Sequence, residues 1–151
     1  PAQSPTGRKQ WTEERFFATL AESVDARTVE IVRDLFEWSE DNADRIWFGT
    51  GAETGSFTFH YLRNGKTISV FTVTTAGKLF LNYGWLSSHV SADVIADFHA
   101  RVTAIPSFKR VPADFTKWPA LAIADAVGET EAMTAFRQVV EDLRHRLEEQ
   151  S

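Results

Sequence analysis

The chain contains no cysteine among its 151 residues. This excludes disulfides, thiolate nucleophiles and zinc sites built on cysteine. Because cysteine-free chains suit a reducing compartment, we expect a cytoplasmic protein. No apolar run approaches the roughly 20 residues that a membrane-spanning helix needs. We therefore expect no membrane partner.

Positive charge is scarce as well: Asp and Glu outnumber Lys and Arg by 21 to 16, for a net charge of −5. A protein that binds nucleic acid over its whole surface is normally basic, so only a local basic patch could serve. What the chain has in abundance is aromatic residues, with twelve Phe and five Trp. Rings bury large areas, so we expect most of them in the core.

The first part of the chain favours helices. Residues 1–10 hold two prolines, a glycine and no large apolar side chain, which predicts a linker or disordered lead. Residues 11–151 are then a single domain. Thr12 and Asp25 are predicted to cap two amphipathic helices, the second ending near Asp41.

From residue 45 the apolar period changes from 3.6 to 2, which predicts strands. A short strand at residues 46–48 precedes a glycine-rich loop at residues 49–55. Strands at residues 56–62 and 67–74 flank Asn64-Gly65, a strong hairpin signal. A second tight turn at Ala76-Gly77 leads into a strand at residues 79–85.

The last part of the chain returns to helices. One is predicted from Ser91 to about Ala104, and another from Thr130 onward. Between them, residues 106–127 contain three prolines, which favours either irregular structure or one short edge strand. The expected fold is α+β: an antiparallel three- to four-stranded β-meander flanked by N-terminal and C-terminal helices.

Two-residue turns fix strand register, so the faces of the sheet can be predicted. One face is strongly apolar and must be covered by helices. The other mixes hydroxyls, an amide and a histidine with aromatic rings, although a bulge at either turn would exchange the faces. Its predicted members are Thr58, His60, Leu62, Ser69, Phe71, Val73, Phe80 and Asn82.

This mixed face is the main candidate binding surface. His60, Phe71 and Asn82 stand at its centre, and its rim holds three basic residues: Arg63, Lys66 and Lys78. Spaced rings with a basic rim are typical of sheets that stack single-stranded bases. The other interpretations are that the last helix or the proline-rich segment covers part of the face, or that a homodimer does.

A secondary candidate patch combines basic residues with nearby aromatic rings, and its charged members are Lys109, Arg110 and Lys117. Catalytic patterns are missing. The loop glycines are spaced G-x-G-x-x-x-G and precede a strand, unlike a dinucleotide-binding loop. The four histidines show no metal-binding spacing. We expect no metal, no cofactor and no catalytic residue.

Several short strings resemble a family of uncharacterised small bacterial α+β domains. They are Ile46-Trp47-Phe48-Gly49-x-Gly51, Gly55-Ser56-Phe57, Leu79 to Leu86 and Ala104-Ile105-Pro106, in the pattern W-x-G-x-G…G-S-F…T-x-G…W-L…I-P. Phe48 and Ser107 depart from the pattern. The resemblance implies a bacterial origin and the fold, but no activity. The helix-meander-helix order is also similar to double-wing folds, some of which are linked to DNA.

The sequence therefore favours a non-catalytic binding or interaction module, part of a larger bacterial protein, whose partner is nucleic acid or another protein. One alternative is an enzyme, or enzyme subunit, acting on nucleic acid with a site near residues 49–55 and His60. Another is a homo-oligomerisation domain.

Overall fold

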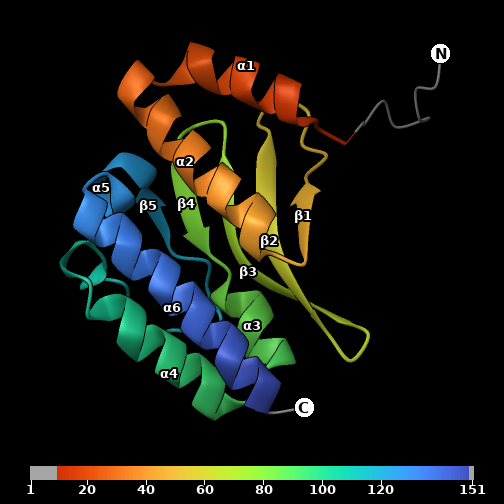
Figure 1. The fold of residues 1–151 in the computed structure, drawn as a ribbon, viewed down its shortest axis with the longest axis vertical. Coiled ribbons are helices and arrows are strands. Elements are labelled where there is room, and N and C mark those ends of the chain that lie inside the picture. Colours follow the sequence, from red (N-terminus) through yellow and green to blue (C-terminus); the bar gives the residue numbers. More distant parts are fainter. Residues whose placement is uncertain (1–9, 150–151) are drawn as a thin grey trace.

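The structure, a computed structural model, describes residues 10–149, so the linker predicted at residues 1–10 lies outside it except for Gln10. Helices and strands alternate in blocks along the chain (Figure 1). In order they are α1 (Glu13–Ser23), α2 (Ala26–Asn42), β1 (Arg45–Phe48), β2 (Ser56–Arg63), β3 (Lys66–Thr74), β4 (Lys78–Leu81), α3 (Tyr83–His89), α4 (Ala92–Thr103), the 3-10 helix η1 (Pro106–Phe108), β5 (Ala120–Ala122), α5 (Ile123–Val127) and α6 (Thr130–Glu149).

The strands form one antiparallel sheet in the sequential order β1-β2-β3-β4-β5, which confirms the α+β class. The sheet has one strand more than the prediction allowed. That strand, β5, comes from the proline-rich segment and pairs with β4, with Leu121 opposite Leu79. The short edge strand expected in this segment is confirmed, but the segment also contains η1 and α5, which the prediction did not include.

The helices begin where the sequence predicts. Thr12 Oγ1 accepts a hydrogen bond from the Arg15 amide at 3.2 Å, and Asp25 Oδ1 accepts one from the Thr28 amide at 2.9 Å. These side chains satisfy amides that the first turn of a helix leaves without a backbone partner.

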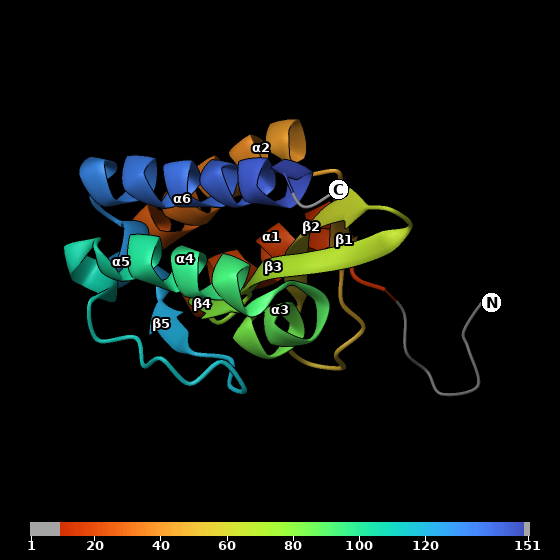
Figure 2. The ribbon, with the colours of Figure 1, turned by 90° about the horizontal axis from the view of Figure 1, so that it is seen from below.

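One face of the sheet is covered by α1, α2 and α6 (Figure 2). Phe57 of β2 lies 5.4 Å from Phe16 of α1 and 5.0 Å from Phe36 of α2, measured between ring centroids. On β3, Phe71 lies 5.3 Å from Phe136 of α6. Edge-to-face pairs of this kind add to the stability that burial alone provides, so the face covered by these helices is the core.

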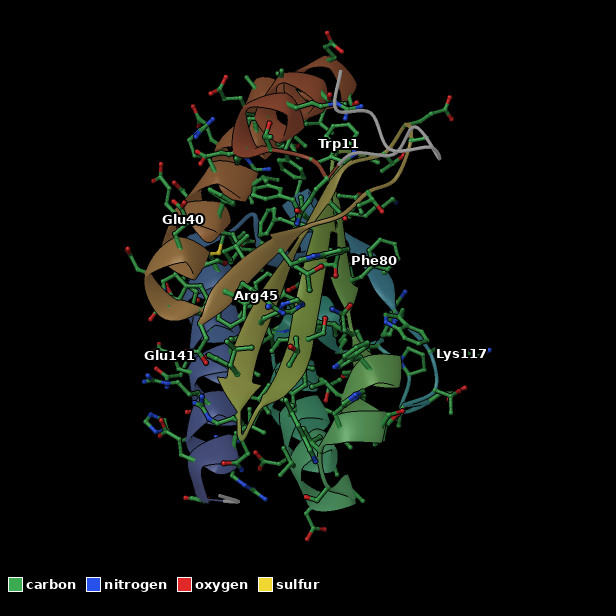
Figure 3. The ribbon with its side chains drawn as sticks, turned by 90° about the vertical axis from the view of Figure 1, so that its right-hand side faces the viewer. Trp11, Glu40, Arg45, Phe80, Lys117 and Glu141 are labelled. Carbon is green, nitrogen blue, oxygen red and sulfur yellow. The ribbon has the colours of Figure 1, made fainter. Side chains whose placement is uncertain are left out.

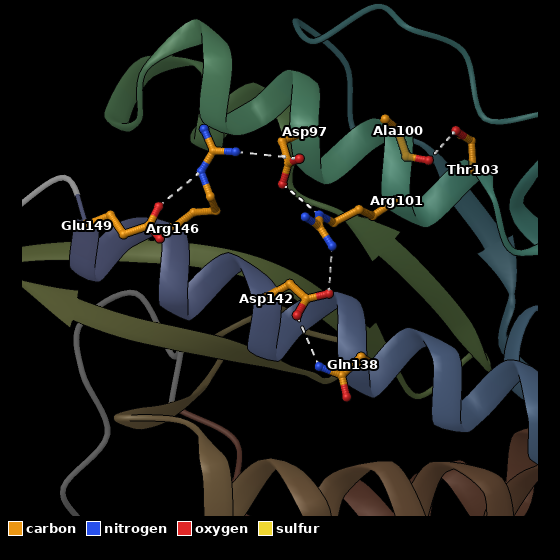
Figure 4. Close-up of polar contacts among 8 residues, drawn as sticks. All are labelled: Asp97, Ala100, Arg101, Thr103, Gln138, Asp142, Arg146 and Glu149. Carbon is orange, nitrogen blue, oxygen red and sulfur yellow. Dashed lines mark hydrogen bonds and ion pairs between the residues drawn. The ribbon is translucent and has the colours of Figure 1, made fainter.

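Helix α4 packs beside α6, and ion pairs join the two helices at the surface (Figure 4). Arg101 of α4 contacts Asp142 of α6 at 3.1 Å, and Arg146 of α6 contacts Asp97 of α4 at 3.5 Å. Pairs this exposed contribute little each, so the apolar contacts of α4 hold it in place. No helix within residues 10–149 is long and apolar enough to cross a membrane.

The two hairpin turns differ from each other. Asn64 and Gly65 have φ of 52° and 76°, which is the two-residue turn predicted, with Arg63 opposite Lys66. The second turn has three residues between Thr74 and Lys78, and its left-handed position is Gly77 at φ 75°. Because of the extra residue, β4 pairs with β3 one position away from the predicted register.

A bulge in β3 changes the predicted faces further. His60 pairs with Ser69, but Phe59 pairs with Phe71, which leaves Val70 opposite no residue. Beyond the bulge every side chain of β3 lies on the face opposite to the predicted one. The prediction that Phe71 and Val73 lie on the mixed face is therefore wrong, since both are fully buried in the core.

The predicted strand at residues 79–85 is only half correct. It ends at Leu81, and helix α3 follows because the amides of Trp85 and Leu86 both donate to the Asn82 carbonyl. Tyr83 and Leu86 are buried. The helix buries the apolar residues that a longer strand would also have buried, so their alternation does not distinguish the two structures.

Candidate functional site

The sheet face turned away from α1, α2 and α6, here called the open face, carries a groove of about 470 Å³. The loop between β1 and β2 flanks it on one side, and α3 with the segment before β5 on the other. None of its described lining residues carries a charge. Its floor consists of Ser56, Ser69, Thr72, Thr74, Phe80 and Asn82.

Exposed apolar side chains gather around this groove. Among the described residues, four large apolar side chains are exposed: Trp47, Leu62, Trp85 and Trp118. Trp47 and Leu62 occupy open-face positions of β1 and β2, opposite Thr58 and Thr67, and the other two line the groove. Monomeric proteins usually scatter such residues, and their concentration on one face is typical of interaction surfaces.

Asn82 organises the floor of the groove. Its Nδ2 donates to Ser69 Oγ at 3.0 Å and to Thr72 Oγ1 at 3.1 Å. Thr72 Oγ1 in turn lies 2.9 Å from Thr58 Oγ1. Asn82 is 3% exposed, so these bonds satisfy a buried amide. They also fix the orientation of a set of hydroxyl groups.

Trp85 forms part of one wall and is held rigidly. Its indole Nε1 donates to the Thr67 carbonyl at 3.0 Å. His89 stacks on its ring at a centroid distance of 4.3 Å, only 4° from parallel. His89 Nδ1 also donates to the Trp85 carbonyl at 2.8 Å.

Trp118 forms the rest of that wall and lies directly over Gly84. A Cβ on Gly84 would come within 2.2 Å of the Trp118 ring, so only glycine permits this contact. The Gly84 amide donates to the Lys117 carbonyl at 3.0 Å, which ties the segment before Trp118 to α3. Trp118 nevertheless remains 51% exposed, and its ring is available to a ligand.

Trp11 holds the glycine-rich loop that forms the opposite wall. Its amide donates to the Gly49 carbonyl at 2.9 Å, and its indole Nε1 donates to the Gly51 carbonyl at 2.7 Å. A Cβ on Gly55 would lie 2.4 Å from the Trp11 ring. Glycine is therefore needed at Gly55 to let this ring approach the backbone.

His60 lies on the open face beside the groove, paired with Arg45 (labelled in Figure 3). Arg45 Nε donates to His60 Nδ1 at 3.3 Å. Burial, with a smaller effect from the Arg45 charge, lowers the pKa of His60 to about 4. The imidazole is neutral at physiological pH and accepts a hydrogen bond, so it is not ready to donate a proton.

The structure divides the predicted site residues among three places. His60, Lys78 and Asn82 do lie on the open face, where Lys78 is exposed at the start of β4. Phe71 does not, because the bulge places it in the core, where it stacks on Phe59. The prediction that Phe71 stands at the centre of the binding surface is therefore wrong.

Arg63 and Lys66 pair at the end of the first hairpin, away from the groove. Arg63 is turned toward the helical layer, where it contacts Asp44 at 3.1 Å and Glu148 of α6 at 3.5 Å. Both basic residues, with His89, line a smaller pocket of about 180 Å³ at that end. They do not form the rim of the groove.

The secondary patch is also divided. Lys109 and Arg110 directly follow η1, whereas Lys117 adjoins the groove-lining Trp118. All three are exposed, but only Lys117 is next to the site. The sequence prediction named neither Trp118 nor Trp85 as a site residue.

The described lining of the groove offers hydroxyl groups, an amide and aromatic rings, and no acid, base or nucleophilic thiol. Within residues 10–149 no group of three or more His, Asp or Glu is placed to hold a metal ion. Such a lining suits a ligand with a flat ring and polar edges.

The comparisons with known proteins give no further guide to this site. No family model matches the chain, and no match was found among curated proteins or solved structures.

Proposed function

We propose that the chain is a non-catalytic binding module that holds a ring of its ligand in the groove of the open face, against Trp85 and Trp118. The observation that carries this proposal is the pair of exposed indoles, that of Trp85 held by a hydrogen bond, beside a floor of hydroxyl groups. Fixed side chains lose little conformational freedom on binding, so they bind more tightly than mobile ones.

The floor supports the same proposal. Asn82 and Thr72 already satisfy one another, yet hydroxyl oxygens have further lone pairs that can accept hydrogen bonds from a ligand. Polar groups of this kind give orientation and specificity, while the rings supply the contact area.

An enzyme acting on nucleic acid at this site is the less well supported alternative. It would use the glycine-rich loop and His60, whose lowered pKa keeps the ring neutral. Glu53 is the acidic residue of that loop, and it is exposed and does not line the groove. General acid–base catalysis needs a group with a pKa near the working pH.

A homo-oligomerisation domain is the other alternative, because a second copy of the chain could cover the exposed tryptophans. Sedimentation equilibrium distinguishes the two proposals. A concentration-dependent dimer that is lost in Trp118→Ala would show that a second copy of the chain, and not a ligand, covers the groove.

The experiment that tests the binding proposal is a thermal-shift screen with nucleosides, short oligonucleotides and neutral oligosaccharides. Each hit is repeated on Trp118→Ala and on Leu62→Ala, which removes an exposed side chain from the same face but outside the groove. We expect hits that are lost in the first variant and kept in the second. A panel with no such hit would overturn the proposal.

A further inference from the structure

Building on the proposed binding function, we propose that the ligand is single-stranded nucleic acid. Its bases would stack on Trp85 and Trp118, and its phosphates would contact Lys78 and Lys117. Both the rings and the charges of the open face point to this class of ligand.

The two tryptophans provide a stacking platform that is already in place. The ring of Trp85 is held by His89 and by its bond to the Thr67 carbonyl, and the ring of Trp118 packs on Gly84. Every base has a flat π-face, so such a platform binds strands with little regard to sequence. In a duplex those faces are covered by neighbouring base pairs, so a single strand is preferred.

The uncharged floor suits a base better than a phosphate. A base carries donors and acceptors along its edge, and Ser69 and Thr72 contribute hydroxyl groups to the groove floor. A groove of about 470 Å³ falls within the usual size of small-molecule sites. We therefore place the base inside the groove and the phosphates at its margin.

The strands themselves favour phosphates at that margin, although Glu53 lies in the loop of one wall and Asp114 lies beside Lys117. None of the five described strands contains Asp or Glu, although the chain as a whole is acidic. Acidic residues outnumber basic ones in α1, α2 and α6, on the other side of the sheet. In Figure 3 Glu40 and Glu141 lie on the helical side of the strands, whereas Phe80 and Lys117 lie on the opposite side.

Two lysines lie near the groove, although neither lines it. Lys78 occupies an open-face position of β4, two residues before Phe80, and Lys117 precedes Trp118. Both are exposed. A neutral oligosaccharide could also stack on the tryptophans, but it would make no use of these charges. The charge distribution therefore favours nucleic acid.

The test is the fluorescence anisotropy of a short labelled oligothymidylate, titrated with the whole chain at about 50 mM and about 200 mM salt. Two phosphate contacts on a single strand predict a slope of about −1.4 in the logarithm of affinity against that of salt. The affinity should therefore fall about sevenfold over this range. Unlabelled duplex of the same length should compete poorly.

Matched variants separate stacking from charge. Trp118→Ala should weaken binding by about 5- to 150-fold at either salt concentration, the equivalent of one stacked base. Trp118→Phe should recover part of that loss. Lys78→Ala should make the salt slope shallower by about 0.7. Lys66→Ala, which removes an exposed strand-end lysine away from the groove, should leave the slope unchanged.

Circular dichroism confirms that each variant is folded. Absence of binding at about 50 mM salt would overturn this inference. So would equal competition by duplex, or affinity unaffected by Trp118→Ala. A neutral oligosaccharide such as cellohexaose could bind instead, with its binding lost in Trp118→Ala. In that case the groove remains a binding site and only the nucleic-acid inference falls. If no ligand of the screen binds, both proposals fall.

Discussion

Replacing Phe71 by alanine tests the strand register on which the whole description of the open face depends. In the structure Phe71 is fully buried. Its ring stacks on Phe59 at 5.1 Å and meets Phe136 of α6 edge-on at 5.3 Å. Without the bulge at Val70, Phe71 would lie on the open face.

The expected loss of stability follows from these contacts. Burial of a phenylalanine side chain is worth about 1.5–3 kcal/mol, and each aromatic pair adds about 0.5–1.5 kcal/mol. Large-to-small changes at fully buried phenylalanines destabilise by about 3–5 kcal/mol once the cavity is included. We expect Phe71→Ala to fall in that range.

Phe80 supplies the matched comparison, because it is a phenylalanine of the neighbouring strand that lies on the groove floor and is only partly buried. Phe80→Ala should lower the free energy of unfolding by about 1 kcal/mol. Urea denaturation followed by circular dichroism measures both variants, with a similar m-value expected for each.

A loss for Phe71→Ala no larger than that for Phe80→Ala would refute the register. Phe71 would then share the open face with Phe80, and Thr72 and Thr74 could not form the groove floor. The composition of the site would have to be derived again.

Three further predictions concern the groove and the open face around it. Gly55→Ala should lower the free energy of unfolding by about 1–3 kcal/mol, because the new Cβ collides with the buried Trp11 ring; a neutral result in urea would show that this ring does not pack there. His60 should titrate near pH 4 by NMR, since its folded pKa lies below the unfolded value of 6.5. The contribution of neutral His60 to the free energy of unfolding is complete above pH 6.5 and is lost as the pH falls toward 4. His60→Gln should therefore make stability depend less on pH in this range. An unchanged dependence of stability on pH in the variant would contradict the burial argument. Asn82→Ala should lower the free energy of unfolding by about 1–3 kcal/mol, because it leaves buried hydroxyl groups without their partner. A urea midpoint equal to that of the parent protein would contradict the hydrogen-bond network of Asn82.

Much of the fold follows from local patterns in the sequence. Thr12 and Asp25 were predicted as N-caps because their side chains stand before amphipathic runs, and both caps are confirmed. Asn64-Gly65 predicts its turn because two successive residues must take positive φ there. These features depend on few neighbouring residues, which is why the sequence alone reveals them.

The bulge could not be predicted in the same way. Val70 and Phe71 are adjacent apolar residues between Ser69 and Thr72, and either of them could continue the alternation of the strand. The helical layer settles the choice, because Phe136 of α6 packs against Phe71. That contact joins distant parts of the chain, so the period of the strand contains no sign of it.

The candidate site was predicted only in part for a related reason. His60, Lys78 and Asn82 were found because they belong to strands or strand ends with a readable alternation. Trp118 reaches the groove through the pairing of β5 with β4 and its packing on Gly84, both tertiary effects. The prediction does not include Trp85, because it extends a strand through the residues that form α3.

The most direct test of the central claim is an NMR titration of the five indole N–H groups with a short oligothymidylate, assigned through single Trp→Phe variants. Trp38 serves as the internal control, since it packs on Phe59 on the helical side of the sheet. The account predicts that the resonances of Trp85 and Trp118 shift and that the resonance of Trp38 does not. Shifts confined to Trp38, or no shift in the two groove tryptophans at saturation, would contradict it.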